Sequence, residues 1–166
     1  NERHSSIAVS VPDRPFFNIY RTAIAVTGDY TQQQHGGSKV SAQAEIVTLV
    51  NRVNAVLERE LSVRLQLIAN NSEIVYENAE TDPYTQSSGY SRMFENIDNL
   101  DKVIGNENFD LGHVIFWGGG GIATPSSICS DSKAGGVSGG RPISTAPDIN
   151  VFMHEVGHQF AAYHTF

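Results

Sequence analysis

Hydrophobic positions along the chain follow two periods, one typical of strands and one typical of helices. Ile19–Thr27 is a nearly continuous apolar, β-branched run, which predicts a strand buried on at least one face. Four apolar residues between Ile46 and Leu57 recur at i, i+4, i+7 and i+11, which predicts a helix over Ser41–Glu60. The sequence between them, G-D-Y followed by T-Q-Q-Q-H-G-G-S, predicts a turn and a polar loop.

The second half of the chain continues this alternation. A helix is expected over Tyr90–Ile104, and a last helix is expected to begin near Asp148, a good N-cap residue behind Pro147. Short strands are expected at Val63–Ala69, Gly112–Trp117, Ile122–Ile128 and Gly136–Ser138, with a possible extension at Ile74–Tyr76.

Strands that alternate with helices in this order predict an α/β fold with a mainly parallel sheet. Pro125 restricts the strand that contains it to a sheet edge, because proline cannot donate a hydrogen bond to a neighbouring strand. The glycines Gly118–Gly121 before it are equally consistent with a flexible loop.

Composition narrows the classes of function. The 166 residues, 40% of them hydrophobic, are enough for one domain with a core. A net charge of −7 and scattered basic residues argue against a nucleic-acid partner. The chain contains no apolar stretch of the roughly 18 residues that a membrane-spanning helix needs, so membrane insertion is not expected.

The candidate chemistry lies in HEVGHQFAAYHTF, from His154 to Phe166. His154 and His158 are four residues apart, so on a helix their imidazoles project from the same side, one turn apart. This spacing suits two ligands of one zinc ion at about 2.0–2.1 Å. Glu155 stands beside the first histidine, where its carboxylate can accept a proton from a water that zinc has acidified.

The alternative interpretation is that these are ordinary surface histidines. The apolar residues from Ile149 to Phe160 form one face of the expected helix, and at about 100° per residue His154 and His158 lie about 140–180° from its centre. Because the two histidines share the side opposite the core, a metal site is favoured. On a continued helix His164 would rise roughly 9 Å beyond His158. It can therefore be a ligand only if the helix breaks near Ala161 and the chain turns back.

The same residues resemble the H-E-x-x-H-x-x-G-x-x-H pattern of the metzincin zinc proteases, in particular the reprolysin- or adamalysin-like group and its bacterial secreted members. The resemblance implies that His154, His158 and His164 bind Zn²⁺ and that Glu155 is the catalytic base. Less specifically, it extends upstream over most of the chain. It implies that G-G-G-G-I-A-T-P-S-S-I-C forms an antiparallel edge strand. The residues of this strand expected to pair with a polypeptide substrate are Gly121, Ile122, Ala123 and Thr124.

The fold implied by the resemblance is a metzincin-like N-terminal subdomain. It consists of a twisted, mostly parallel sheet with an antiparallel edge strand, two packing helices and a C-terminal active-site helix. The family carries a methionine turn after its third histidine, whereas Met93 and Met153 both precede His164. Residues 1–166 are therefore expected to be the N-terminal subdomain of a catalytic domain, without its C-terminal subdomain. The resemblance also implies a disulfide partner for Cys129 outside this chain.

A second departure is Ala161, where the family has glycine. A left-handed turn at alanine costs about 1 kcal/mol, which would loosen His164. Two functions follow: a secreted or cell-surface zinc endopeptidase, or a catalytically impaired module that binds zinc or polypeptide. The other histidines are interpreted structurally, His113 as a satisfied, partly buried residue and His4 and His35 as solvated loop residues.

Overall fold

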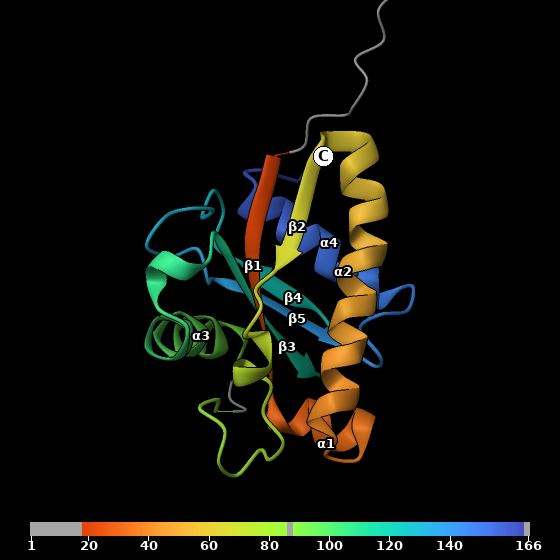
Figure 1. The fold of residues 1–166 in the computed structure, drawn as a ribbon, viewed down its shortest axis with the longest axis vertical. Coiled ribbons are helices and arrows are strands. Elements are labelled where there is room, and N and C mark those ends of the chain that lie inside the picture. The colour runs from red at the N-terminus through yellow and green to blue at the C-terminus, as the bar shows by residue number, and fades with distance from the viewer. Residues whose placement is uncertain (1–17, 86–87, 165–166) are drawn as a thin grey trace, which may run out of the picture.

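A computed structural model describes residues 18–85 and 88–164, and these form a five-stranded sheet flanked by helices (Figure 1). The order of the strands is β2-β1-β3-β5-β4. All neighbouring strands are parallel except β4, which runs antiparallel to β5 at one edge. The strands are β1 (Asn18–Val26), β2 (Val63–Leu67), β3 (Leu111–Trp117), β4 (Gly121–Ala123) and β5 (Gly136–Gly140). The α-helices are α1 (Gly28–His35), α2 (Lys39–Leu61), α3 (Gly89–Val103) and α4 (Asp148–Gln159), with short 3₁₀ helices at Asn71–Ile74 and Asn106–Asn108.

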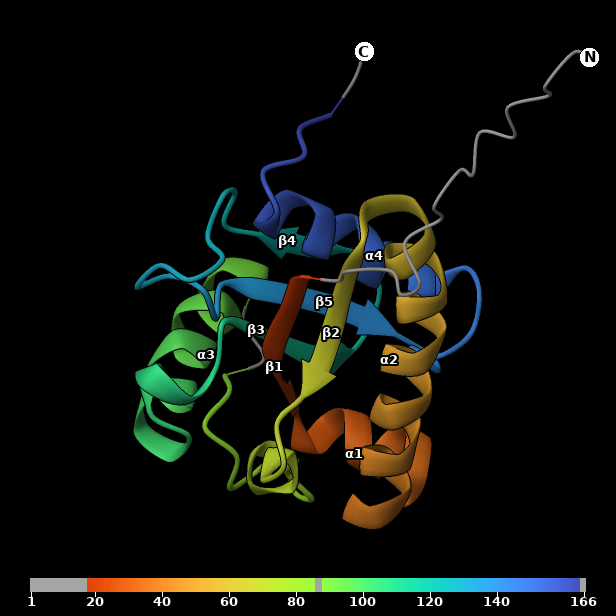
Figure 2. The same cartoon turned by 45° about the horizontal axis from the view of Figure 1, so that its top comes forward.

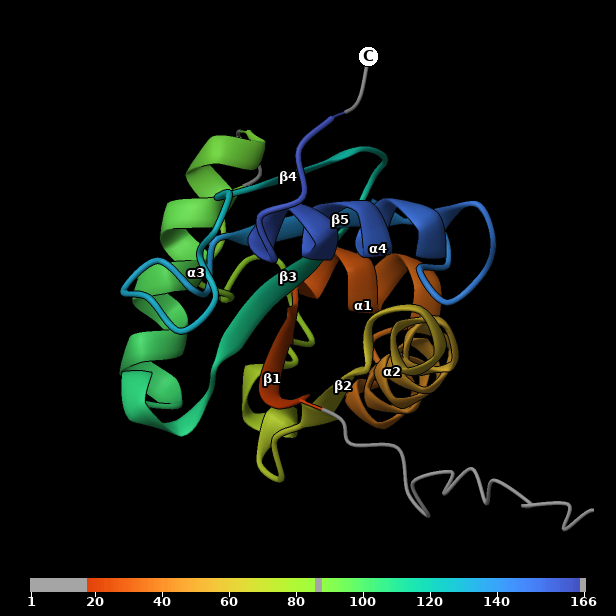
Figure 3. The ribbon, with the colours of Figure 1, turned by 90° about the horizontal axis from the view of Figure 1, so that it is seen from above.

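The sheet is covered on both faces, which explains why its central strands are apolar at successive positions. In β1, Ile24 and Val26 belong to the hydrophobic cluster beneath α1, α2 and α4, whereas Ala23 and Ala25 belong to the cluster beneath α3. Figure 3, seen from above, shows α3 on one side of the sheet and α2 on the other. The predicted α/β fold with a mostly parallel sheet and an antiparallel edge strand is confirmed.

The helix α2 follows the apolar spacing of its sequence. Ile46, Val53 and Leu57 are buried in the first cluster. The hydroxyl of Ser38 accepts a hydrogen bond from the Ser41 backbone N–H and caps the start of the helix. Ser62 ends it in a left-handed conformation with φ 52°. In the described part of the chain, no helix is both long and apolar enough to cross a membrane.

Several local predictions were wrong. Residues 28–35 form α1 instead of a turn and a loop, because Tyr30 and Thr31 are buried on one side and Gly36 ends the helix with φ 59°. Ile74 lies in a 3₁₀ helix, and the expected strand there is reduced to a single bridge between Val26 and Val75.

Asp148 is the first residue of α4 and not its N-cap, since the N-cap position is occupied by Pro147. The carboxylate of Asp148 instead accepts a 2.7 Å hydrogen bond from the backbone N–H of Arg141, closing the loop before the helix. The expected strand Ile122–Ile128 is shorter than predicted and ends at Ala123, before Pro125. Its assignment as an edge strand is nevertheless confirmed. Figure 2 shows β4 lying above β5 next to α4.

Candidate metal centre and the neighbouring sheet edge

The helix α4 is fixed by an apolar side and a buried polar side chain. Phe152 and Val156 lie in the first hydrophobic cluster. Gln159 is buried as well, and its amide donates to the carbonyls of Gly112 and Lys133 at 3.1 Å each. His154 and His158 therefore project from the side of α4 that is not packed into the core, as their spacing predicted.

The chain leaves the helix just after Gln159 through a left-handed turn. Ala161 has φ 69°. The N–H of Ala161 bonds to the carbonyl of His158, and the N–H of Ala162 bonds to the carbonyl of Gly157, both at 2.9 Å. This pair of hydrogen bonds is the Schellman motif, in which glycine is usual at the position that Ala161 occupies. The break near Ala161 that His164 needs in order to be a ligand is present, and it reverses the chain toward the two helical histidines.

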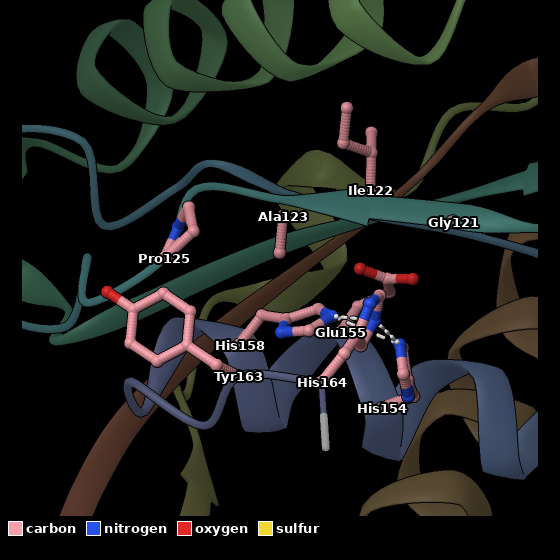
Figure 4. A pocket seen from close by; sticks show the side chains of 9 residues that line it. All are labelled: Gly121, Ile122, Ala123, Pro125, His154, Glu155, His158, Tyr163 and His164. Carbon is pink, nitrogen blue, oxygen red and sulfur yellow. Dashed lines mark hydrogen bonds between the residues drawn. The ribbon is translucent and has the colours of Figure 1, made fainter. Parts of the chain in front are cut away.

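The reversal brings His164 beside His154 and His158. Their Nε2 atoms lie 3.0 Å from one another in all three pairs (Figure 4). In the described part of the chain these three form the one cluster of potential metal ligands whose atoms converge. Tetrahedral zinc bonds of about 2.0–2.1 Å separate two ligand nitrogens by roughly 3.4 Å. A set of three imidazoles therefore fits zinc after opening by a few tenths of an ångström, and imidazole is a ligand that zinc favours.

The turn also selects the tautomer of one histidine. Nδ1 of His158 lies 2.7 Å from the carbonyl oxygen of Ala162, so this nitrogen carries the proton and donates it. Nε2 of His158 then presents a lone pair to the cluster. Backbone carbonyls commonly orient metal-binding histidines in this way. The conformation at Ala161 thus contributes to both His158 and His164.

Glu155 lies between the histidines and the edge strand, and only 6% of its surface is exposed. Burial raises the pKa of its carboxyl above the ordinary value, against the opposing effect of charge on His158 and His164. Its position depends on Gly121, because a Cβ atom there would lie 2.6 Å from Cγ of Glu155. Figure 4 shows the carboxylate directed into the space between β4 and the imidazoles.

The edge of β4 offers backbone hydrogen-bonding groups beside this cluster. The N–H of Gly139 donates to the Gly120 carbonyl, and the N–H of Thr124 donates to the Gly135 carbonyl, both at 2.8 Å. Because backbone groups alternate in direction along an antiparallel strand, those of Gly121 and Ala123 point to the outer edge. Because β4 is the last strand of the sheet, these outward backbone groups face no further strand among the described residues. Of the four residues predicted to pair with substrate, two present backbone groups outward, whereas Ile122 and Thr124 face β5.

A hollow of about 380 Å³ lies between this edge and α4. The three histidines and Glu155 line it on one side, and the β4 segment through Pro125 lines it on the other. The loop after β4 is tied to the end of α4, since the N–H groups of Ser126 and Ser127 donate to the carbonyls of His158 and Gln159. The bond from Ser127 uses the carbonyl of Gln159, one of the last carbonyls that a helix leaves unpaired, whereas the carbonyl of His158 also accepts from Ala161.

Two polar side chains that support the site were not identified from sequence. His113 lies beneath α4, with Nδ1 3.1 Å from Gln159 Oε1 and Nε2 2.9 Å from Ser138 Oγ. Burial lowers its pKa to about 4, against the raising effect of the bond to Gln159. His113 was expected to be satisfied and partly buried, and it is satisfied but fully buried.

The second supporting side chain that was not identified from sequence is Glu45 of α2. Its carboxylate accepts hydrogen bonds from the Tyr30 hydroxyl and from the backbone N–H and hydroxyl of Ser144, in the loop before α4. His35 bonds to it at 2.8 Å. The prediction that His35 is a solvated loop residue was therefore wrong. Its side chain completes a buried hydrogen-bond network around Glu45. The one feature of the sequence that could have indicated the burial of Glu45 is its four-residue spacing from the buried Leu49, which places both side chains on the same side of α2. His4 lies outside the described residues.

Comparison with known proteins agrees with this geometry. A family model described as reprolysin-like, metallo-peptidase family M12B, matches residues 43–165. No curated protein matches the chain. A solved structure titled "Structure of a chaperone-substrate complex" is similar over 90% of this chain, with a TM-score of 0.61 and 14% identity, which shows a shared fold alone. This chain spans 24% of the length of that one. The match to the family model over most of the sequence shows that the chain belongs to the reprolysin-like metzincin metallopeptidases.

Proposed function

We propose that this chain is a zinc-dependent endopeptidase in which His154, His158 and His164 bind the metal and Glu155 is the catalytic base. The observation that supports this most strongly is the convergence of three Nε2 atoms, 3.0 Å apart, beside a buried carboxylate. A zinc ion bound there would polarise a peptide carbonyl and lower the pKa of water.

The roles of the chain's own groups follow from their positions. The outward backbone groups of Gly121 and Ala123 would pair with an extended polypeptide and hold its scissile bond over the hollow. Glu155 would accept a proton from the attacking water and then donate it to the leaving amine nitrogen. Burial favours this cycle, since it brings the pKa of the carboxyl closer to neutrality. Secretion or a cell-surface location remains a proposal that rests on the family resemblance.

The test is cleavage of an unstructured polypeptide by the purified chain, with and without a chelator, beside a Glu155→Gln variant. Glutamine keeps the size of the side chain but cannot take up the proton. We expect chelator-sensitive cleavage by the unmodified chain, a loss of at least a hundredfold in Glu155→Gln, and retention of zinc by that variant. Glu80→Gln, an exposed acid in the loop before α3, is the matched control and should cleave normally.

The alternative is a module that binds zinc or polypeptide without turnover. The left-handed φ of 69° at Ala161 favours it, since strain there weakens the hold on His164. Zinc and polypeptide binding without cleavage by the unmodified chain would support the module. Cleavage that persists in Glu155→Gln would contradict the proposed role of Glu155.

A further inference from the structure

A second hollow, of about 330 Å³, lies on the opposite face of the same edge strand. The side chains of Tyr90, Phe116, Ile122 and Val137 line it together with glycines at 89 and 119–121. No charged side chain of the described residues is part of this lining. The ring of Phe116 is held in place by the buried guanidinium of Arg92, 4.3 Å from the ring centroid.

Gly121 and Ile122 line both hollows, so the two sites share one strand. The side chains of β4 alternate between them. Figure 4 shows Ala123 directed toward α4 and Ile122 directed away from the histidines. On that far side Ile122 packs against the cluster beneath α3, and a Cβ atom at Gly89 would lie 3.1 Å from its Cγ2.

A peptide paired with β4 would alternate in the same way. Residues bonded to the backbone groups of Gly121 and Ala123 would turn their side chains to the face of α4 and Glu155. The residue between them would form a non-hydrogen-bonded pair with Ile122, in which side chains approach most closely and lie on the same face. That face is the one with the second hollow.

We propose that this second hollow is a specificity subsite, which receives one apolar or aromatic side chain of the polypeptide substrate. The inference rests on the proposed function, because it requires a peptide strand along β4. The chemistry of the lining supports an apolar occupant: aliphatic and aromatic walls would leave a charged side chain without a partner. Tyr90 forms an accessible wall, with 65% of its surface exposed.

The test uses an exposed aromatic pair on α3. Tyr90 and Phe94 are one turn apart and similarly exposed, at 65% and 61%, but only Tyr90 lines the hollow. Cleavage of a diverse peptide library should show one substrate position with a preference for leucine or phenylalanine over alanine of about 10-fold, as expected for partial burial of such side chains. Tyr90→Ala should reduce this preference at least threefold at that position alone. Phe94→Ala should leave the profile unchanged.

Binding provides a readout that does not depend on turnover. Two fluorescent peptides that differ only by leucine or aspartate at the identified position would be titrated against Glu155→Gln. The leucine peptide should bind more tightly, and the added Tyr90→Ala substitution should remove most of the difference. Equal binding, or a profile unaffected by Tyr90→Ala, would overturn the subsite while cleavage leaves the proposed function standing.

Two other results would also overturn the inference. If the unmodified chain neither cleaves nor binds any peptide, the proposed function fails and the subsite fails with it. If the chain dimerises in solution, and Tyr90→Ala and Phe94→Ala both abolish the dimer, the hollow is covered by a second copy and not by substrate.

Discussion

Replacing Ala161 by glycine should strengthen the turn that carries His164. An L-residue in the left-handed conformation costs about 1–2 kcal/mol, and glycine removes this cost at φ 69°. Glycine also raises the conformational entropy of the unfolded chain, which reduces this gain in stability by about 0.4–1 kcal/mol. Because Ala161 is exposed, its methyl group contributes little buried area. The expected net gain in the free energy of unfolding is about 0.5–1 kcal/mol.

The same relief should improve metal binding. A gain of about 1 kcal/mol in the closed turn corresponds to zinc binding that is about fivefold tighter. Urea unfolding of the metal-free chain measures the stability, and competition with a chromophoric chelator measures the zinc affinity. The matched control is Ala162→Gly, since Ala162 is the next exposed residue and does not have a positive φ. It should destabilise the chain by about 0.4–1 kcal/mol.

Destabilisation of the chain by Ala161→Gly as large as that by Ala162→Gly would contradict this prediction. That result would mean that the backbone at Ala161 carries no left-handed strain. In that case the departure from the glycine of the family pattern has no consequence for His164.

Three further predictions concern the groups around the site. Gly121→Ala should lower peptidase activity at least tenfold with zinc retained, because the added Cβ would lie 2.6 Å from Cγ of Glu155. Unchanged activity would contradict the dependence of Glu155 on Gly121. Burial lowers the pKa of His113 to about 4, so the unfolded chain takes up a proton first as the pH falls. About 2 kcal/mol of the free energy of unfolding should therefore be lost between pH 7 and pH 5. Urea unfolding at both pH values, for the unmodified chain and for His113→Gln, isolates this contribution. Glu45→Gln should destabilise the chain by about 2 kcal/mol, since hydrogen bonds from α1 and from the loop before α4 converge on that carboxylate. An unchanged midpoint of thermal unfolding would contradict this stabilising role of Glu45.

Local spacing predicted the elements that present the histidines. The positions of His154 and His158 on one side of α4, and the need for a break near Ala161, follow from helical periodicity alone. The order of strands and helices was sufficient for the α/β class, and Pro125 was sufficient to identify the edge strand. These inferences depend on neighbours within a few residues.

Contacts between distant residues could not be read in this way. Ser144 donates a hydrogen bond to Glu45, 99 residues earlier in the sequence, and nothing near either residue indicates this pairing. The segment Gly28–His35 reads as a turn because of its glycine and aspartate, yet burial of Tyr30 beneath the loop before α4 stabilises a helix. The dependence of Glu155 on the missing side chain at Gly121 is also visible only in three dimensions.

The three-histidine zinc centre is tested most directly by the zinc content of the purified chain, measured by elemental analysis beside His158→Ala and Cys129→Ser. Cys129 is an exposed metal-binding side-chain type outside the histidine cluster, so its replacement is the control. We expect one zinc per chain, lost in His158→Ala and kept in Cys129→Ser. A chain without zinc, or zinc that survives His158→Ala, would contradict the three-histidine centre.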